Sequence, residues 1–228
     1  MTPENSTQKR LATYSVLAGL TPLIPIPFLD EAAKRYFKRR MTRELAKARG
    51  LSLDAQSVKT LSDDPDTGCL SGCLLGALFY PIKWLFKKIF LLFGAKRAVD
   101  FVTRSYHQGY LIDYALEKGY SADAARARAG IDRVLTDTNT SLIEYAVRQA
   151  FGQSKGALRS AARGLQRVLM RLARRPTQEQ IDQALESAEG QEKREVESLA
   201  ALLQKIMDQV PPEHFERLRT SLDTTMAG

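Results

Sequence analysis

Apolar residues recur along most of this chain at the three- and four-residue spacing of amphipathic helices, while alternating runs of β-branched residues are nearly absent. The pattern predicts an all-α protein. We expect a multi-helix bundle with an apolar helical hairpin, a candidate for embedding in a membrane, and a long acidic C-terminal helix. The expected helices span about 6–20, 30–50, 95–118, 121–136, 154–174, 177–208 and 212–222, and a further element begins near residue 140.

Proline, glycine and small polar residues mark the ends of these helices. Three prolines within residues 20–29 cannot continue a helix and predict an extended apolar elbow. Gly119 closes one helix and Ser121 caps the next, while Thr177 and Gln180 form a capping box. The resulting segments are N-terminal helices (1–50), a linker (51–68), an apolar and helical core ending in a basic helix (69–175), and acidic C-terminal helices (176–228).

Residues 69–99 form the most apolar stretch and contain no acidic side chain. Apolar bulk with basic charge alone is typical of a segment that meets an anionic membrane surface. The residues expected to contact the membrane are Trp84, Phe86, Lys87, Lys88, Phe90 and Phe93. A straight span is disfavoured, because the apolar run from Cys69 to Ile82 reaches only about 21 Å as a helix against the roughly 30 Å of hydrocarbon. Interfacial or re-entrant contact, a buried core helix and a true span all remain open.

Charge is segregated along the chain, which carries a net charge of +8. No acidic residue lies between Glu144 and Glu179, whereas residues 176–228 hold five basic and eleven acidic residues. The basic residues of the expected helix recur every four positions and form a stripe suited to phosphates of lipid or nucleic acid. This stripe, the predicted anion- or partner-binding site, consists of Lys155, Arg159, Arg163, Arg167 and Arg171. The alternatives are a solvated face or a face paired with the acidic helix, which a reversal at Pro176 would bring opposite.

No residue pattern points to catalysis, a cofactor or a metal. The sequence has no Gly-x-x-x-x-Gly-Lys-Ser/Thr loop for a nucleotide. The two cysteines, Cys69 and Cys73, lack further zinc ligands, because His107 and His214 are expected to be distant and isolated. His107 precedes Asp113 among three tyrosines, a cluster that we interpret as structural.

The stretch Ile24-Pro-Ile-Pro-Phe-Leu-Asp30, followed by Met41, Leu45-Ala46 and Gly50, resembles a signature of helical bacterial membrane-associated domains of an uncharacterised family. In that family an IPIPF-x-D elbow precedes a helix ending M…IA…G, and the domains are often joined to Era-like small GTPases or found in inner-membrane proteins. The likeness covers about 40 of the 228 residues. It implies membrane association, with a GTPase as a candidate partner.

These observations together predict a non-enzymatic adaptor or scaffold. We expect it in the cytoplasm at the inner face of a membrane, bound to anionic lipids and to a protein partner. The alternative is a helical nucleic-acid-binding protein that uses the basic helix within residues 145–175.

Overall fold

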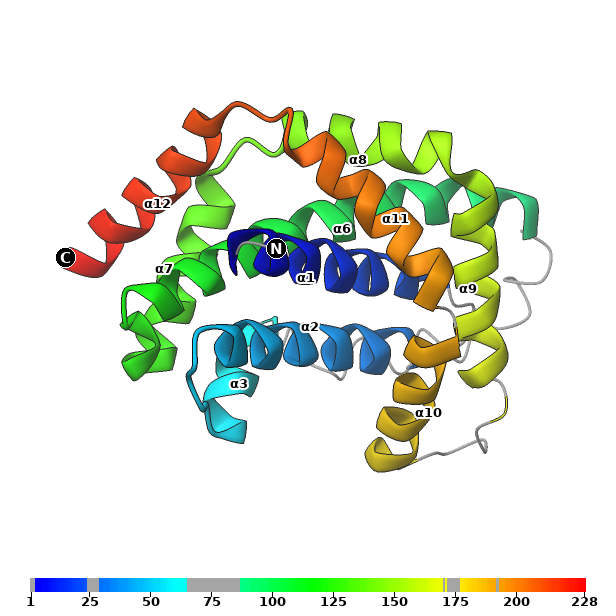
Figure 1. Ribbon diagram of the computed structural model, residues 1–228, viewed down its shortest axis with the longest axis horizontal. Coiled ribbons are helices and arrows are strands. Elements are labelled where there is room, and N and C mark those ends of the chain that lie inside the picture. The colour runs from blue at the N-terminus through cyan, green and yellow to red at the C-terminus, as the bar shows by residue number, and fades with distance from the viewer. Residues whose placement is uncertain (1–2, 24–28, 65–86, 170, 172–176, 192) are drawn as a thin grey trace.

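The computed structural model describes residues 3–23, 29–64, 87–169, 171, 177–191 and 193–228. Within these ranges all regular structure is helical and no strand occurs, so the predicted all-α class is confirmed (Figure 1). The helices are α1 (Pro3–Leu20), α2 (Leu29–Ala48), α3 (Ala55–Ser62), α6 (Lys87–Glu117), α7 (Ala124–Asp137), α8 (Ser141–Gln153), α9 (Lys155–Leu169), α10 (Gln178–Gln191), α11 (Lys193–Met207) and α12 (Pro212–Ala227), with 3₁₀ turns at Thr21–Leu23 and Tyr120–Asp123.

Local signals set several helix ends. Gly119, in the left-handed region at φ 75°, follows α6, as the sequence predicts. The capping box before α10 is present: the Thr177 N–H donates to Gln180 Oε1 at 3.0 Å, and the Gln180 N–H donates to Thr177 Oγ1 at 3.3 Å. Asp123, two residues beyond the expected Ser121, caps α7, because its carboxylate reaches the Arg126 N–H at 2.9 Å.

One contiguous apolar core runs through the described helices, with α1 at its centre, packed on α2, α6 and α11 (Figure 1). Helices α1 and α6 approach each other closely at Gly19. A Cβ atom there would lie 2.0 Å from Val102 Cγ2 and 3.1 Å from the carbonyl oxygen of Ala98. The contact of these two helices therefore depends on the absence of a side chain at this position.

Substituting Gly19→Ala is expected to lower the free energy of unfolding by about 1 to 3 kcal/mol, because the new methyl group overlaps Val102 and forces the helices apart. The matched control is Gly152→Ala in α8, where a new Cβ meets nothing within 4 Å. Helix propensity alone is expected to stabilise this control by up to about 1 kcal/mol. Urea denaturation of both variants measures the difference, and equal effects of the two substitutions would contradict the close approach.

Two expected segments differ from the structure. The linker expected at 51–68 contains helix α3, whose Val58 and Leu61 are buried against the core. The mostly polar composition of this stretch gave no sign of these two core positions. The single long acidic helix expected over 177–208 is two helices, α10 and α11, which run in different directions in Figure 1. Each buries its own apolar side: α10 packs on α2 and α9, whereas α11 packs on α1, α8 and α9.

The apolar segment is only partly covered by the description. Trp84 and Phe86 lie outside the described residues, as do Cys69 and Cys73. Lys87, Lys88, Phe90 and Phe93 belong to the first turns of α6, but their side chains also lie outside the description. None of the helices in the described ranges combines the length and the apolarity needed to cross a bilayer.

Candidate functional site

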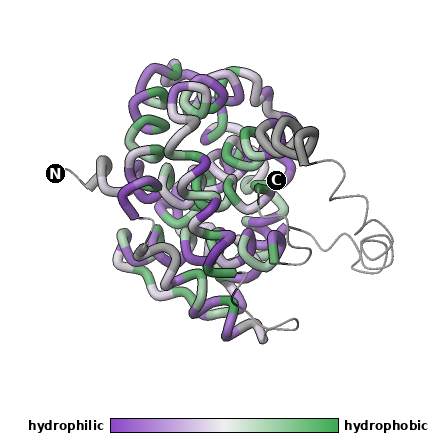
Figure 2. The backbone as a smooth tube through the Cα atoms, turned by 90° about the vertical axis from the view of Figure 1, so that its right-hand side faces the viewer, coloured by the Kyte–Doolittle hydropathy of each residue, from purple (hydrophilic) through white to green (hydrophobic). Residues whose placement is uncertain are grey.

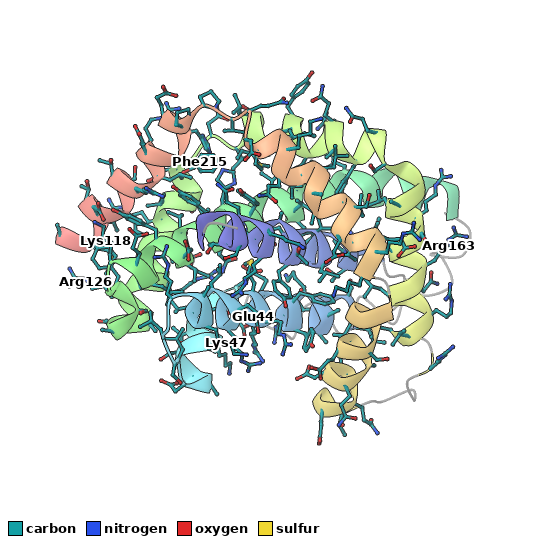
Figure 3. All side chains as sticks on the ribbon, in the orientation of Figure 1. Glu44, Lys47, Lys118, Arg126, Arg163 and Phe215 are labelled. Atoms are coloured by element: carbon teal, nitrogen blue, oxygen red, sulfur yellow. The ribbon has the colours of Figure 1, made fainter. Side chains whose placement is uncertain are left out.

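Helix α9 presents an apolar side to the protein and a basic side to solvent. Its buried residues Ala161, Leu165, Val168 and Leu169 belong to the common core, and α9 packs against both α10 and α11. The arginines of the predicted stripe, Arg159, Arg163, Arg167 and Arg171, are all exposed. Figure 3 shows Arg163 on the outer side of α9. Lys155 begins the helix, and its side chain lies outside the description.

The stripe arginines form no ion pair with any acidic side chain of the described residues. One hydrogen bond lies within the stripe: Arg163 Nε donates to the carbonyl oxygen of Arg159 at 3.2 Å. The acidic helices instead pair elsewhere, with Glu186 3.9 Å from Arg40 of α2 and Glu197 3.5 Å from Lys9 of α1.

The basic helix α9 packs against the acidic helices α10 and α11, as predicted. Among the described residues, the charged side chains of these helices do not pair with each other. The apolar sides of α9, α10 and α11 form the interface, because burying those side chains stabilises the fold more than exposed ion pairs do. The arginines are left pointing outward. The stripe needs no rearrangement of α10 or α11 to become accessible.

The stripe lies at one end of the molecule. In Figure 1 both α9 and the first turns of α6 lie toward the right-hand end of the long axis. Figure 2 looks onto this end of the molecule. Along each helix drawn there, hydrophilic and hydrophobic residues are interspersed. Residues 87–93, which include part of the predicted membrane-contact set, thus belong to the same end of the molecule as the arginines.

A second group of basic side chains, on α2 and α7, is already neutralised. Lys38 Nζ lies 2.7 Å and Lys34 Nζ 3.2 Å from the carboxylate of Asp64, and Arg128 Nη2 lies 3.5 Å from it. Arg39 pairs with the neighbouring Asp63. Lys34 also pairs with Glu31, and Arg128 with Asp132, each at 2.8 Å, so four carboxylates balance the four cations. These contacts fix the chain just after α3 to two other helices.

Burial and pairing shift the pKa values in this cluster. Burial lowers the pKa of the Lys38 ammonium to about 8, although Asp64 opposes the shift. Burial also disfavours ionised Asp64, but Lys38 and Lys34 together outweigh it and hold the pKa of the carboxyl well below its usual value. The Asp64 carboxylate is thus charged at neutral pH and stabilises the cations around it.

The two histidines form a buried pair, which corrects the expectation that they are distant and isolated. His107 Nε2 of α6 lies 3.0 Å from His214 Nε2 of α12, and His107 Nδ1 lies 2.8 Å from the carbonyl oxygen of Thr103. A carbonyl only accepts, so His107 Nδ1 carries the proton and donates. His107 Nε2 then accepts from the Nε2–H of His214. Because the two Nε2 atoms share one proton, the two rings cannot both be protonated, and His107 is the neutral acceptor.

Burial lowers the pKa of His107 to about 4, and burial followed by the nearby Arg217 lowers the pKa of His214. Both nitrogens of His107 are engaged in hydrogen bonds. Among the described residues no group of three or more histidine, cysteine, aspartate or glutamate side chains is placed to hold a metal ion. Asp113 belongs with His107 to the cluster that the sequence led us to interpret as structural. It forms an ion pair with Arg49 at 2.7 Å.

Helix α12 is tied to the body by polar contacts as well as by its buried Leu218 and Leu222. The Asp223 carboxylate accepts from the hydroxyl of Tyr114 at 2.7 Å and from the hydroxyl of Tyr120 at 2.9 Å. The Arg219 guanidinium lies 5.4 Å from the ring centre of Tyr110 and 5.3 Å from that of Tyr114. The tyrosines that recur every four residues in α6 therefore serve as the docking side for the C-terminal helix.

No protein-family model matches this sequence, no curated protein matches it, and no solved structure matches its fold. The likeness of the proline-rich elbow to membrane-associated domains stays a prediction, and residues 24–28, which carry most of it, lie outside the description. The accompanying residues Met41, Leu45 and Ala46 are buried on α2, where they serve the core.

Proposed function

We propose that this protein is a non-enzymatic adaptor or scaffold that associates with the anionic cytoplasmic face of a membrane through the arginines of α9. The observation that carries the proposal is the exposure of Arg159, Arg163 and Arg167 along one side of α9, and of Arg171 just beyond its end, without an acidic partner among the described side chains. Because the apolar side of α9 is buried in the core, the helix offers charge to a surface and has no apolar face to insert. Binding by this helix is electrostatic.

The expected strength of such binding is modest. Each basic residue near an anionic leaflet contributes about 1 kcal/mol, so four contribute about 4 kcal/mol, which corresponds to a dissociation constant of about 1 mM. A second contact is needed for stable association. The aromatic residues expected to contact the membrane, which precede and begin α6, supply it in this proposal: each buried side chain adds about 1.5 to 3 kcal/mol.

A partner protein requires a surface other than the stripe. Among the described residues the large exposed apolar side chains are Leu51, Leu142 and Tyr145, and the last two are neighbours on α8, with 46% and 67% of their surface exposed. Leu142 and Tyr145 form a small apolar area on α8, which we propose as the contact for a partner. The likeness of the elbow makes a small GTPase the partner that we propose to test first.

Neutralising two central arginines tests the membrane role. Arg163→Gln with Arg167→Gln is expected to weaken binding to phosphatidylserine-containing vesicles about 30-fold at low salt, because about 2 kcal/mol of attraction is lost. The matched control is Arg133→Gln with Arg194→Gln, which removes the same charge from exposed positions on α7 and α11. We expect the control to bind nearly as tightly as the unchanged protein in vesicle flotation.

Two results would overturn the proposal. Unchanged vesicle binding by the stripe variant would show that the arginines do not face the membrane. Tighter binding of a DNA or RNA duplex than of the vesicles, at the same salt and with the same dependence on Arg163 and Arg167, would establish nucleic acid as the partner of this surface.

A further inference from the structure

Helix α8, which runs along the upper edge of the molecule in Figure 1, has an exposed side that is nearly free of charge. Of its seven exposed residues only Arg148 is charged, and the other six are Ser141, Leu142, Tyr145, Gln149, Gly152 and Gln153. On α12, in contrast, four of nine exposed residues are charged, namely Glu213, Glu216, Arg217 and Arg219. A side that is poor in charge and carries an exposed tyrosine has the composition of the centre of a protein–protein interface.

Four residues of this side follow the spacing of a helix–helix seam. Leu142, Tyr145, Gln149 and Gly152 are separated by three, four and three positions, which is the recurrence of the contact positions in a coiled coil. They lie along one line of the helix, on the side opposite to the residues that α8 buries. Leu142 and Tyr145 project from this line, whereas Gly152 leaves a hollow in it, because a Cβ there meets nothing within 4 Å. A second helix can therefore pack along this line.

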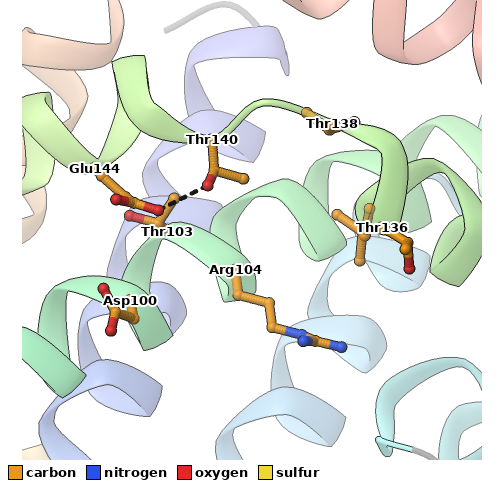
Figure 4. A pocket seen from close by; sticks show the side chains of 8 residues that line it. Asp100, Thr103, Arg104, Thr136, Thr138, Thr140 and Glu144 are labelled. Carbon is orange, nitrogen blue, oxygen red and sulfur yellow. Dashed lines mark hydrogen bonds between the residues drawn. The ribbon is translucent and has the colours of Figure 1, made fainter.

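The charged residues beside the line match a second copy of the same helix. Glu144 and Arg148 are one turn apart and lie on the same flank of the line. Arg148 is exposed, and Glu144 accepts a hydrogen bond from Thr140 at 2.7 Å through one of its two oxygens (Figure 4). When two copies of a helix run antiparallel about a two-fold axis, residues of the same flank meet. Glu144 of each copy then lies opposite Arg148 of the other.

We propose that this side of α8 binds a second copy of the chain in an antiparallel pair. The inference names the partner for the apolar area of α8, so it rests on the proposed function, and it leaves a small GTPase to bind elsewhere. With a rise of about 1.5 Å per residue, setting Glu144 opposite Arg148 brings the two Tyr145 side chains together near the two-fold axis. The same register places Leu142 of each copy between Gln149 and Gly152 of the other. One register thus matches the charges and covers the apolar side chains.

The antiparallel pair leaves the arginine stripe uncovered. Helix α8 ends at Gln153 and α9 begins at Lys155, so the two α9 helices lie at opposite ends of the α8 pair. The stripe is therefore not part of the contact, and self-association and vesicle binding can be measured separately.

Sedimentation equilibrium of the full chain tests the contact. The paired surface is small, so we expect a dissociation constant of about 10 to 100 μM. Leu142→Ser with Tyr145→Ser is expected to raise this constant at least about 30-fold, because it removes the apolar area that the contact covers. The matched control is Leu51→Ser, which replaces an exposed leucine outside α8 and should change the constant less than about two-fold.

Reversing single charges tests the antiparallel orientation. Glu144→Arg and Arg148→Glu are each expected to weaken self-association at least about 10-fold at low salt, because like charges then meet across the contact. An equimolar mixture of the two variants is expected to associate within about three-fold of the unchanged protein, since each copy supplies the charge that the other lacks. Damage to the fold by either substitution would not be repaired by mixing.

The proposal is overturned if the chain stays monomeric up to about 500 μM, if the Leu142 and Tyr145 variant associates unchanged, or if mixing restores nothing. It is also overturned if the chain is monomeric and the Tyr145 resonances respond to an Era-like GTPase instead. Vesicle flotation separates this inference from the proposed function. A monomer whose vesicle binding depends on Arg163 and Arg167 contradicts the inference alone, whereas a dimer that binds no vesicles contradicts the proposed function alone.

Discussion

Substituting Asp64→Ala is expected to lower the free energy of unfolding by about 3 to 5 kcal/mol, the largest effect of a single change that we foresee. Asp64 is the shared counter-charge of Lys38, Lys34 and Arg128, which come from two helices. Without it, the Lys38 ammonium, whose side chain is 3% exposed, is left buried and unpaired. Removing one partner of a buried ion pair costs far more than the pair itself contributes, because the remaining charge has lost its hydration without compensation.

Urea denaturation at pH 7 measures this loss. The matched control is Glu117→Ala, which removes a carboxylate from the exposed end of α6 while Asp113 remains bound to the same Arg49, and should cost less than about 1 kcal/mol. A second variant, Asp64→Ala with Lys38→Met, is expected to recover a large part of the lost stability, since it leaves no unpaired ammonium. A loss below 1 kcal/mol for Asp64→Ala alone would contradict the description of this cluster.

Acidification from pH 7 to pH 4.5 is expected to remove about 2 to 3 kcal/mol of stability through His107 alone. Its pKa is about 4 in the folded protein, against the ordinary value of 6.5. Between these two values the unfolded chain binds more protons than the folded one. The contribution is therefore fully present above pH 6.5 and is lost as the pH falls toward 4. His214, whose pKa is also lowered, adds to the loss in the same direction.

Aspartate and glutamate carboxylates also titrate in part of this pH range. The contribution of the two histidines to the loss of stability must therefore be measured separately. The variant His107→Gln with His214→Gln is expected to be less stable at pH 7 and to show a clearly smaller dependence on pH between 4.5 and 7. The chain has two histidines, so the two Cε1 resonances in an NMR titration are readily assigned. Protonation of His107 in the folded protein above pH 6 would refute the neutral buried pair.

The helix boundaries could be predicted largely from the sequence, because caps are local. Thr177 and Gln180 stand three residues apart and bond to each other, and Gly119 adopts the left-handed conformation that ends α6. The division of the acidic stretch into α10 and α11 could not be predicted. It depends on which neighbours Leu185 and Leu203 pack against, which is a property of the folded chain.

The candidate sites show the same division between local and distant information. The four-residue recurrence of arginines on α9 is visible in the sequence, but only the packing of Leu165 into the core shows that the arginines face outward. The histidine pair has no local signal, since its members lie 107 positions apart. A small polar pocket likewise joins Asp100 and Thr103 of α6 to Glu144 of α8. Its single hint in the sequence is the set of threonines at the end of α7 and just before α8.

The polar anchoring of α12 affects the order in which the protein opens. Its buried residues are His214, Leu218 and Leu222. Further attachment comes from ring contacts of Phe215 and Arg219 and from hydrogen bonds of Tyr114 and Tyr120. A helix held in this way detaches more easily than α1, which the core surrounds. Water reaches His107 once α12 has moved away, so amide exchange in α12 should precede that of the central helices. Uptake of a proton at His107 would then be controlled kinetically by the undocking of the C-terminal helix.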